Sequence, residues 1–234
     1  MKEQIYTIPV NTAFEKSRDD KSCGCPFCTM QETLQKNELD LITGASMMEP
    51  DIRIKTNEQG FCRKHYDMML LMKNRLGIAL MLESHLDEVR GKVRSKGIVP
   101  MLKGKGTEAC DQLGRLERSC YVCGKIDFHI DKMFECAVYL WSTEREFREK
   151  TDAQPFFCLP HYRRFIEYAK RDLPKKDFGD FYDAVSKIEN AYMDTLCDDV
   201  SWFCKKFDYR YTDEPWGNSK DSIERAVAFL NGRV

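Results

Sequence analysis

Cysteine and histidine recur in this sequence at spacings that suit a metal ion. Two segments have the form Cys-x-x-Cys, and two later segments have the form Phe-Cys-x-x-His-Tyr. A Cys-x-x-Cys turn presents two thiolates to one ion, and a cysteine and a histidine three residues apart lie on one face of a helix. The segments together supply two sets of three thiolates and one imidazole, a ligand set of structural zinc sites. The candidate metal ligands are Cys25, Cys28, Cys62, His65, Cys120, Cys123, Cys158 and His161.

The two motifs occur in the same order in both halves of the chain. Phe61 follows Cys28 by 33 residues, and Phe157 follows Cys123 by 34 residues. Four residues of the first insert recur at a constant offset of 95 in the second, Glu49, Arg53, Lys55 and Thr56 as Glu144, Arg148, Lys150 and Thr151. Such agreement over a long stretch predicts an internal duplication.

Equal insert lengths favour metal sites that close within each repeat. On this interpretation the first site consists of Cys25, Cys28, Cys62 and His65, and the second consists of Cys120, Cys123, Cys158 and His161. The alternative is that the two halves exchange partners. In that arrangement Cys25 and Cys28 share a metal ion with Cys158 and His161.

A closed set of four ligands predicts two structural Zn²⁺ ions, because it leaves no position on the ion for water or substrate. An iron–sulfur cluster is an alternative, since cysteine thiolates are its normal ligands and histidine can replace some of them. A dithiol redox protein is a further alternative, because Cys25-Pro26-Phe27-Cys28 resembles the redox pair of glutaredoxins. That pair follows a strand in a βαβ pattern, which this sequence does not show.

The elements that must position these ligands are expected to be helices. Apolar residues in both inserts recur at three- and four-residue spacings, so each insert is expected to form two helices. A long helix is expected from Tyr66 to about Ser95 and should run through the core. A second long helix is expected from about Asp177 to Lys206, and a final amphipathic helix is expected from about Asp221 to Leu230. The predicted fold is therefore all-α, with two pseudo-equivalent halves and a C-terminal closing helix. The expected segments are residues 1–102, 103–206 and 207–234, packed as one compact unit.

Two further regions carry charges that could recognise a partner. Between Arg90 and Lys105 there are six basic residues and no acidic one, which could bind nucleic acid or could be a solvated helix end followed by the linker Lys103–Gly106. The C-terminal tail places charges beside aromatic residues, which indicates either a binding pocket or structural ion pairs around a packed tryptophan. Its residues are Asp208, Arg210, Trp216, Asp221 and Arg225.

Composition limits the classes of function. The 234 residues include 37 basic and 38 acidic side chains, a net charge of 37 − 38 = −1, so no global attraction to nucleic acid or anionic membrane is implied. Eleven cysteines without an export signal favour metal or thiol chemistry in a reducing cytoplasm over a disulfide framework. No apolar run is long enough to span a bilayer. Because no catalytic signature stands out either, we expect a non-enzymatic binding or scaffold protein with an unknown protein or small-molecule partner.

The doubled motif and the tail together resemble a known family. The pattern Cys-x-x-Cys … Phe-Cys-x-x-His-Tyr occurs twice and is followed by Phe207–Tyr211, Glu214–Gly217, Asp221 and Arg225-Ala226. In these features the chain is similar, over about residues 20 to 231, to a bacterial cytosolic family catalogued only as a domain of unknown function. The resemblance implies a largely helical, duplicated protein with metal-binding motifs, and it supplies no established activity.

Overall fold

The structure is a computed structural model that describes residues 4–93 and 107–233. Within these residues the chain forms helices and no strands, so the all-α prediction is confirmed. The chain divides into two compact units. Unit 1 comprises residues 1–32 and 130–234, and unit 2 comprises residues 33–129. These boundaries differ from the expected repeat boundaries after residues 102 and 206, because each unit takes helices from both halves of the sequence.

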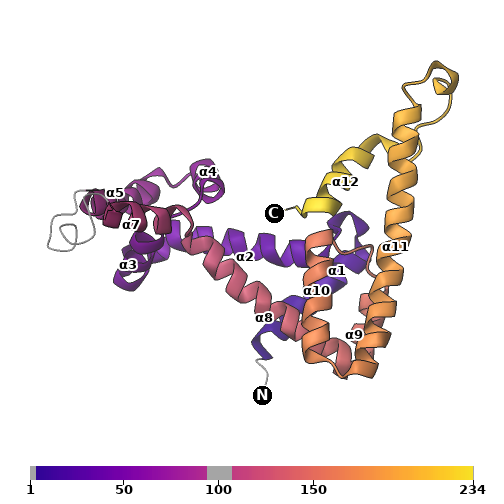
Figure 1. Ribbon diagram of the computed structural model, residues 1–234, viewed down its shortest axis with the longest axis horizontal. Helices are drawn as coiled ribbons and strands as arrows, with labels where there is room; N and C mark the ends of the chain where they lie inside the picture. Colours follow the sequence, from indigo (N-terminus) through magenta and orange to yellow (C-terminus); the bar gives the residue numbers. More distant parts are fainter. Residues whose placement is uncertain (1–3, 94–106, 234) are drawn as a thin grey trace. The chain divides into compact units, whose positions relative to one another are not determined.

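Unit 1 contains most of the helices of the second half together with the N-terminal helix (Figure 1). Helix α10 packs against α11, and α12 packs against both of them. Helix α1 packs against α9. The elements are α1 (Thr7–Asp19), the start of α2 (Pro26–Thr43), the end of α8 (Tyr121–Thr143), α9 (Arg145–Asp152), α10 (Leu159–Asp172), α11 (Lys175–Lys205) and α12 (Ser222–Asn231), with short 3-10 helices at Gln4–Tyr6, Lys21–Cys23, Tyr209–Tyr211 and Ser219–Asp221.

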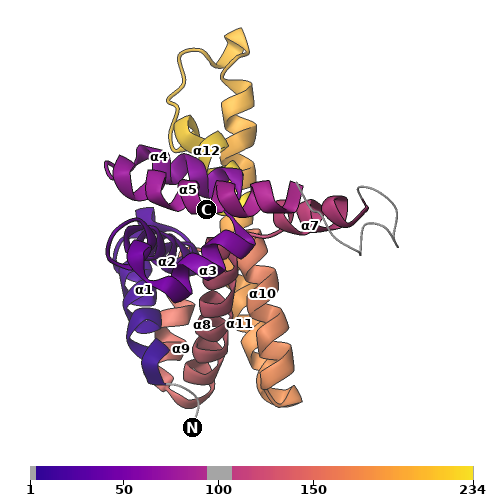
Figure 2. The ribbon, with the colours of Figure 1, turned by 90° about the vertical axis from the view of Figure 1, so that its left-hand side faces the viewer.

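Unit 2 is built around α5, which contacts the helices on either side of it in sequence (Figure 2). Helix α3 makes the most extensive of these contacts. The elements are the end of α2, a 3-10 helix at Ala45–Met48, α3 (Pro50–Gln59), α4 (Arg63–Leu71), α5 (Arg75–Val93), α7 (Thr107–Glu117) and the start of α8.

Each unit has its own hydrophobic core. Unit 1 is filled by seven fully buried phenylalanines, Phe14, Phe27, Phe134, Phe147, Phe157, Phe165 and Phe181. Unit 2 has an aliphatic and methionine-rich core that includes Leu39, Ile42, Met69, Ile78, Met81, Val122 and Ile126. Both cores include residues of the motif helices, so burial of apolar surface fixes the positions from which the ligands project.

Local sequence explains why helices begin at the motifs. Pro26 and Pro50 are the first residues of α2 and α3, where a fixed φ and a missing N–H do no harm. Cys62 and Cys158 are the extended residues that directly precede α4 and α10. Each insert between the motifs forms two α-helices, α2 with α3 and α8 with α9, as expected.

The uninterrupted helix expected from Tyr66 to about Ser95 was wrong, because the chain breaks between α4 and α5. Asn74 begins α5 by accepting a hydrogen bond from the Gly77 N–H at 3.0 Å, and its amide nitrogen donates to the carbonyl of Thr43 at 2.5 Å. Because of this side-chain cap, a new helix begins at Arg75 although the apolar helical pattern continues on both sides. The segment runs through the core only in part, since Met69, Ile78 and Met81 are buried whereas Leu71 next to the break is 87% exposed.

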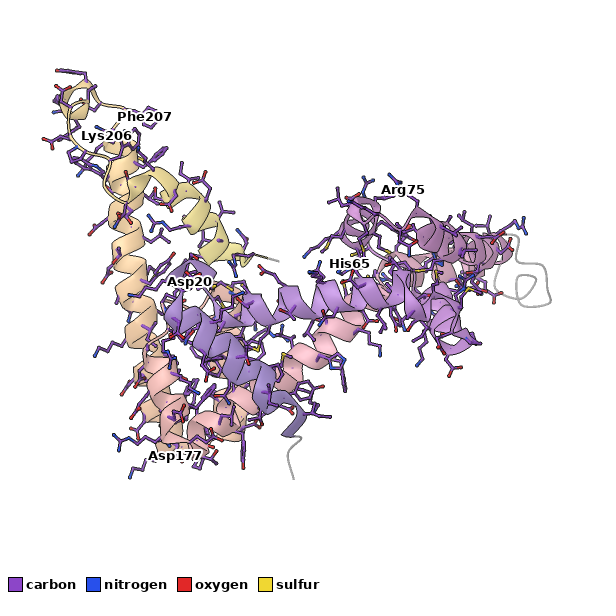
Figure 3. All side chains as sticks on the ribbon, turned by 180° about the vertical axis from the view of Figure 1, so that it is seen from behind. Asp20, His65, Arg75, Asp177, Lys206 and Phe207 are labelled. Carbon is purple, nitrogen blue, oxygen red and sulfur yellow. The ribbon has the colours of Figure 1, made fainter. Side chains whose placement is uncertain are left out.

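At the other end of α11 from Asp177, Lys206 organises the turn that leads into the tail (Figure 3). Its buried ammonium group donates to the carbonyls of Tyr211, Thr212 and Glu214 at 2.5–3.0 Å. The neighbouring Phe207 is largely exposed. In the described part of the chain, no helix combines the length and apolar character needed to cross a membrane.

Candidate metal centres

The structure brings all eight candidate ligands together in two groups, but with exchanged partners. The expectation that each site closes within its own repeat was wrong, and the alternative pairing is the one observed. Within each group, the four ligand atoms all lie within 4.8 Å of one another. Cluster 1, in unit 1, consists of Cys25, Cys28, Cys158 and His161; cluster 2, in unit 2, consists of Cys62, His65, Cys120 and Cys123.

Helix packing within each unit explains the exchange. In unit 1 the start of α2 packs against the end of α8, where the rings of Phe27 and Phe134 stack at 4.0 Å. The chain leaving α8 continues through α9 to the motif that begins α10. In unit 2 the start of α8 packs with the end of α2, and the chain leaving α2 continues through α3 to the motif that begins α4. The Cys-x-x-Cys at the start of α2 therefore lies beside the Cys-x-x-His that begins α10. The Cys-x-x-Cys at the start of α8 lies beside the Cys-x-x-His that begins α4.

Hydrogen bonds near cluster 2 hold its two halves together. The Tyr121 N–H donates to the carbonyl of Gly60 at 3.0 Å, and the Ser119 hydroxyl donates to the carbonyl of Gln59 at 2.7 Å. Gly60 ends α3 with φ +59°, a conformation that favours glycine, and this turn leads directly to Cys62. The backbone thus places Cys62 beside Cys120.

Cluster 1 is fully enclosed. Its three cysteines are at most 1% exposed and His161 is 5% exposed. His161 Nδ1 lies 3.2 Å from Sγ of Cys158, 3.5 Å from Sγ of Cys28 and 3.6 Å from Sγ of Cys25. The other ring nitrogen, Nε2, lies 2.9 Å from Oε1 of Gln31 and can donate to it. That bond leaves the lone pair of Nδ1 free to bind an ion.

Cluster 2 has a similar geometry with less cover. His65 Nδ1 lies 3.2 Å from Sγ of both Cys62 and Cys120 and 3.5 Å from Sγ of Cys123. His65 and Cys120 are buried, whereas Cys62 and Cys123 are partly exposed. Burial, with a smaller contribution from Lys64, lowers the pKa of His65 to about 4. The imidazole is therefore neutral near pH 7, as a metal ligand requires.

These distances fit one tetrahedral ion in each cluster. Zinc bonds to sulfur and nitrogen imply edges of about 3.8 Å between two sulfurs and about 3.6 Å between sulfur and nitrogen. The sulfurs of Cys28 and Cys158 are 3.6 Å apart, and those of Cys62 and Cys123 are 3.8 Å apart. An iron–sulfur cluster contains several irons joined by sulfide, so its ligands must surround a wider core. The close spacing therefore favours a single ion.

If all three thiols of a cluster ionised, the negatively charged sulfurs would repel one another unless a cation lay between them. Burial and the neighbouring thiols raise the pKa of Cys25 well above its ordinary value. Burial and the charge of Cys120 raise the pKa of Cys123 to about 12. Hydrogen bonds from the neighbouring thiols lower the pKa of Cys28, so that one thiolate is favoured in cluster 1. A divalent cation supplies the charge that allows the other thiols to ionise.

The five remaining cysteines stay outside both clusters. Cys23 contacts Asp20, with its sulfur 3.6 Å from Oδ2, and it does not replace a ligand. Cys136 is buried, as expected for a small apolar side chain on a helix. The apolar pattern of α11 predicts burial for Cys197 and Cys204 as well, but both are exposed, as is Cys110.

The two described cations of the basic stretch form ordinary ion pairs. Arg90 pairs with Asp87, and Lys92 pairs with Glu88. The rest of the stretch to Lys105, including the linker, lies outside the described residues. Three arginines beside the histidine motifs are similarly engaged, in the pairs Arg63–Asp67, Arg163–Glu167 and Arg164–Asp131.

The C-terminal tail shows ion pairs beside packed aromatic rings. Arg225 bonds to Asp199 at 2.8 Å and to Asp221 at 2.9 Å. Asp221 and Glu224 have the spacing of a capping residue and its N3 partner, but Asp221 precedes α12 without a side-chain capping bond. Trp216 lies against Phe203, with ring centres 5.6 Å apart. These contacts agree with the structural interpretation of the tail, but Asp221 and Arg225 also line a cleft in unit 1, which keeps the pocket interpretation open.

Unit 1 also contains a cleft of about 1170 Å³ between one face of α11, one face of α12 and the chain before α10. Ala191 and Ala228 leave space between the two helices, and Phe156 contributes an aromatic surface. Gln154 also lines the cleft, and only 5% of its surface is exposed. Its amide nitrogen donates to the carbonyls of Phe14 and Lys150, each at 2.8 Å. Its oxygen is buried without a hydrogen-bond partner.

Three residues that support cluster 1 were not identified from the sequence. Gln31 was detectable in principle, because it lies three residues after Cys28 and therefore on the same face of α2. Gly232 follows α12, and a Cβ built there would lie 3.5 Å from Sγ of Cys158 and 3.7 Å from Sγ of Cys28. Glu189 is a buried carboxylate on α11 that accepts the N–H of Phe157 at 3.2 Å. Nothing in the sequence distinguishes Glu189 from the other acidic residues.

We expect Glu189→Gln to stabilise the protein at alkaline pH. Burial raises the pKa of Glu189 from 4.5 to about 7. Since the folded-state value is the higher one, the stability that Glu189 contributes is present below about pH 4.5 and is lost as the pH rises to about 7. Urea unfolding of both proteins should agree at about pH 4 and differ by on the order of 3 kcal/mol at pH 8. A difference independent of pH would contradict this assignment.

Comparison with known proteins gives a family without an assigned activity. The search of curated proteins returned no match, and neither did the search of solved structures. A family model matches residues 1–234, which is the whole chain, and its description is a family of unknown function. The two clusters therefore lie within a region that the family model covers completely. The chain belongs to this family, DUF6062.

Proposed function

We propose that this protein is a non-enzymatic binding or scaffold protein whose two units are each stabilised by a structural Zn²⁺ ion. The observation that carries the proposal is the assembly of two complete Cys₃His groups from four distant segments. Each closed set of four ligands provides cross-links rather than an open position for chemistry. All eleven cysteines are free thiols, which agrees with a reducing compartment such as the cytoplasm.

Zinc is favoured over the redox alternatives by geometry. The four ligand atoms of each cluster lie within 4.8 Å of one another, which suits one ion better than a polynuclear iron–sulfur centre. A dithiol mechanism requires an accessible cysteine pair, but Cys25 and Cys28 are almost completely buried. Iron and acid-labile sulfide in a brown, anaerobically purified protein would replace the zinc proposal with the iron–sulfur alternative.

A binding role is supported by the cleft in unit 1. Its volume of about 1170 Å³ is large enough for a small organic molecule or a short peptide. A nucleic-acid partner is favoured less, because Arg90 and Lys92 already pair with acidic residues on their own helix.

Pairs of substitutions test both the metal and the exchanged partners. We expect the wild-type protein to carry two zinc ions, measured by mass spectrometry of metals on the purified chain. The double variant Cys28→Ser/Cys158→Ser should retain one ion, because both residues belong to cluster 1. The double variant Cys28→Ser/Cys62→Ser should retain none, because it damages both clusters.

Sites closed within each repeat would give the opposite result for the two double variants. Cys28→Ser/Cys62→Ser would then retain one ion, and Cys28→Ser/Cys158→Ser would retain none. A matched control is Cys136→Ser/Cys197→Ser, which alters two cysteines outside both clusters and should retain two ions. A wild-type protein without zinc would end the proposal.

A further inference from the structure

The two clusters differ in how well an outside ligand can reach them. All four residues of cluster 1 are buried, whereas Cys62 and Cys123 of cluster 2 are both partly exposed. The sulfurs of these two residues lie 3.8 Å apart and form one edge of the ligand tetrahedron. An incoming ligand can therefore approach a metal in cluster 2 along an edge that has no counterpart in cluster 1.

The two histidines also differ in their support. Nε2 of His161 has Oε1 of Gln31 within 2.9 Å, whereas Nε2 of His65 is buried without a hydrogen-bond partner. Gln31 and Ile126 are each the sixth residue of their helices, three residues after the second cysteine of a Cys-x-x-Cys. Isoleucine cannot accept a hydrogen bond, so the position that supports the histidine in cluster 1 cannot do so in cluster 2. Loss of such a partner typically weakens metal binding by about 10–100-fold.

A third difference is the cover over cluster 1. Gly232, with φ +77° and ψ 178°, lies against the sulfurs of Cys28 and Cys158. This backbone conformation is essentially restricted to glycine, which also lets the chain approach the sulfurs closely. The next residue, Arg233, donates a hydrogen bond to Thr29 at 3.3 Å and forms an ion pair with Glu32 at 3.4 Å. These contacts hold the chain at Gly232 against α2.

We propose that cluster 2 is the exchangeable metal site of this protein and that cluster 1 is the permanent one, an inference that rests on the proposed zinc function. The incoming ligand is an anionic thiol or chelator, which the exposed cation of Lys64 beside His65 attracts. Its donor atom bonds to zinc as the sulfur of Cys62 or Cys123 leaves and takes a proton from water. No electron is transferred in this ligand exchange.

The test is the rate at which the zinc-loaded, full-length protein transfers its ions to an excess of 4-(2-pyridylazo)resorcinol, an anionic chelator that changes colour. We expect two phases of one equivalent each, with rates that differ by at least about tenfold. Cys62→Ser/Cys123→Ser should remove the fast phase, and Cys28→Ser/Cys158→Ser should remove the slow one. Equal rates for both ions, or a fast phase that belongs to cluster 1, would overturn the inference.

Single substitutions outside the clusters keep the test informative if a double variant does not fold. Gln31→Leu should accelerate the slow phase by about tenfold or more, and Ile126→Gln should slow the fast phase. If neither variant alters its phase, the role assigned to the histidine partner is wrong and the inference fails with it. A protein without zinc would instead refute the proposed function, which keeps the two failures distinguishable.

Discussion

Cys28→Ser is expected to remove one zinc ion and to lower the free energy of unfolding by more than about 4 kcal/mol. The reason is that metal-binding free energy becomes folding free energy when the site does not exist in the unfolded chain, and structural zinc provides about 10–16 kcal/mol in small domains. Cys28 is completely buried in cluster 1 and contacts both Cys158 and His161. The measurement is urea unfolding followed by circular dichroism, with the metal content determined on the same samples.

The matched control for this variant is Cys136→Ser. Cys136 is also a buried cysteine, 8% exposed, but it belongs to neither cluster, and Thr7 is its neighbour at 3.9 Å. Replacing a buried thiol by a hydroxyl is expected to lower stability by about 1–2 kcal/mol and to leave two zinc ions bound. Equal losses of stability in the two variants would show that the zinc ion contributes little to folding. His161→Ala should behave like Cys28→Ser, because it removes the imidazole of the same cluster.

Phe165→Ala is expected to lower the free energy of unfolding by about 3–5 kcal/mol without loss of zinc. Phe165 is completely buried at the centre of the aromatic core of unit 1. Its ring centre lies 4.8 Å from that of Phe181, 5.0 Å from that of Phe27 and 5.4 Å from that of Phe157. Removing the ring leaves a cavity that these neighbours cannot fill completely.

The control for the core variant is Phe207→Ala in the same unit. Phe207 is 76% exposed, so its removal leaves no cavity and should change stability by less than about 1 kcal/mol. Together with Cys28→Ser, this pair separates the contribution of apolar packing from that of the metal. A Phe165→Ala protein that loses one ion would show that the core and cluster 1 are not separable.

Local patterns in the sequence predicted most of the helices because their signals are local. The apolar spacing along a helix acts within a few residues, and the helices expected from about Asp177 to Lys206 and from about Asp221 to Leu230 agree with α11 and α12. The break at Asn74 was missed because apolar residues continue on both sides of it. One capping side chain, held also by the carbonyl of Thr43, decided the local structure there.

The eight ligands could be identified from residue type and spacing, but their pairing could not. Equal insert lengths suggested closure within each repeat, yet closing a loop of 130 residues rather than 34 costs only roughly 1 kcal/mol more. The rigidity of the helices has a larger influence on which ligands meet than this difference in loop-closure free energy. The 18 residues of α2 carry the chain about 27 Å from its Cys-x-x-Cys before the first insert turns. That outcome depends on tertiary packing, which the motif itself does not encode.

The exchanged ligands also set an order for folding during synthesis. Unit 2 is continuous in sequence, and its cluster is complete once the ribosome has made Cys123. Unit 1 is discontinuous: Cys25 and Cys28 are made early and must wait for Cys158 and His161. Since domains fold as units during synthesis, residues 33–129 can fold while the first 32 residues are still without their partners. The newly made N-terminal segment therefore exposes the thiols of Cys25 and Cys28 and the apolar face of α1 until the chain has emerged as far as His161.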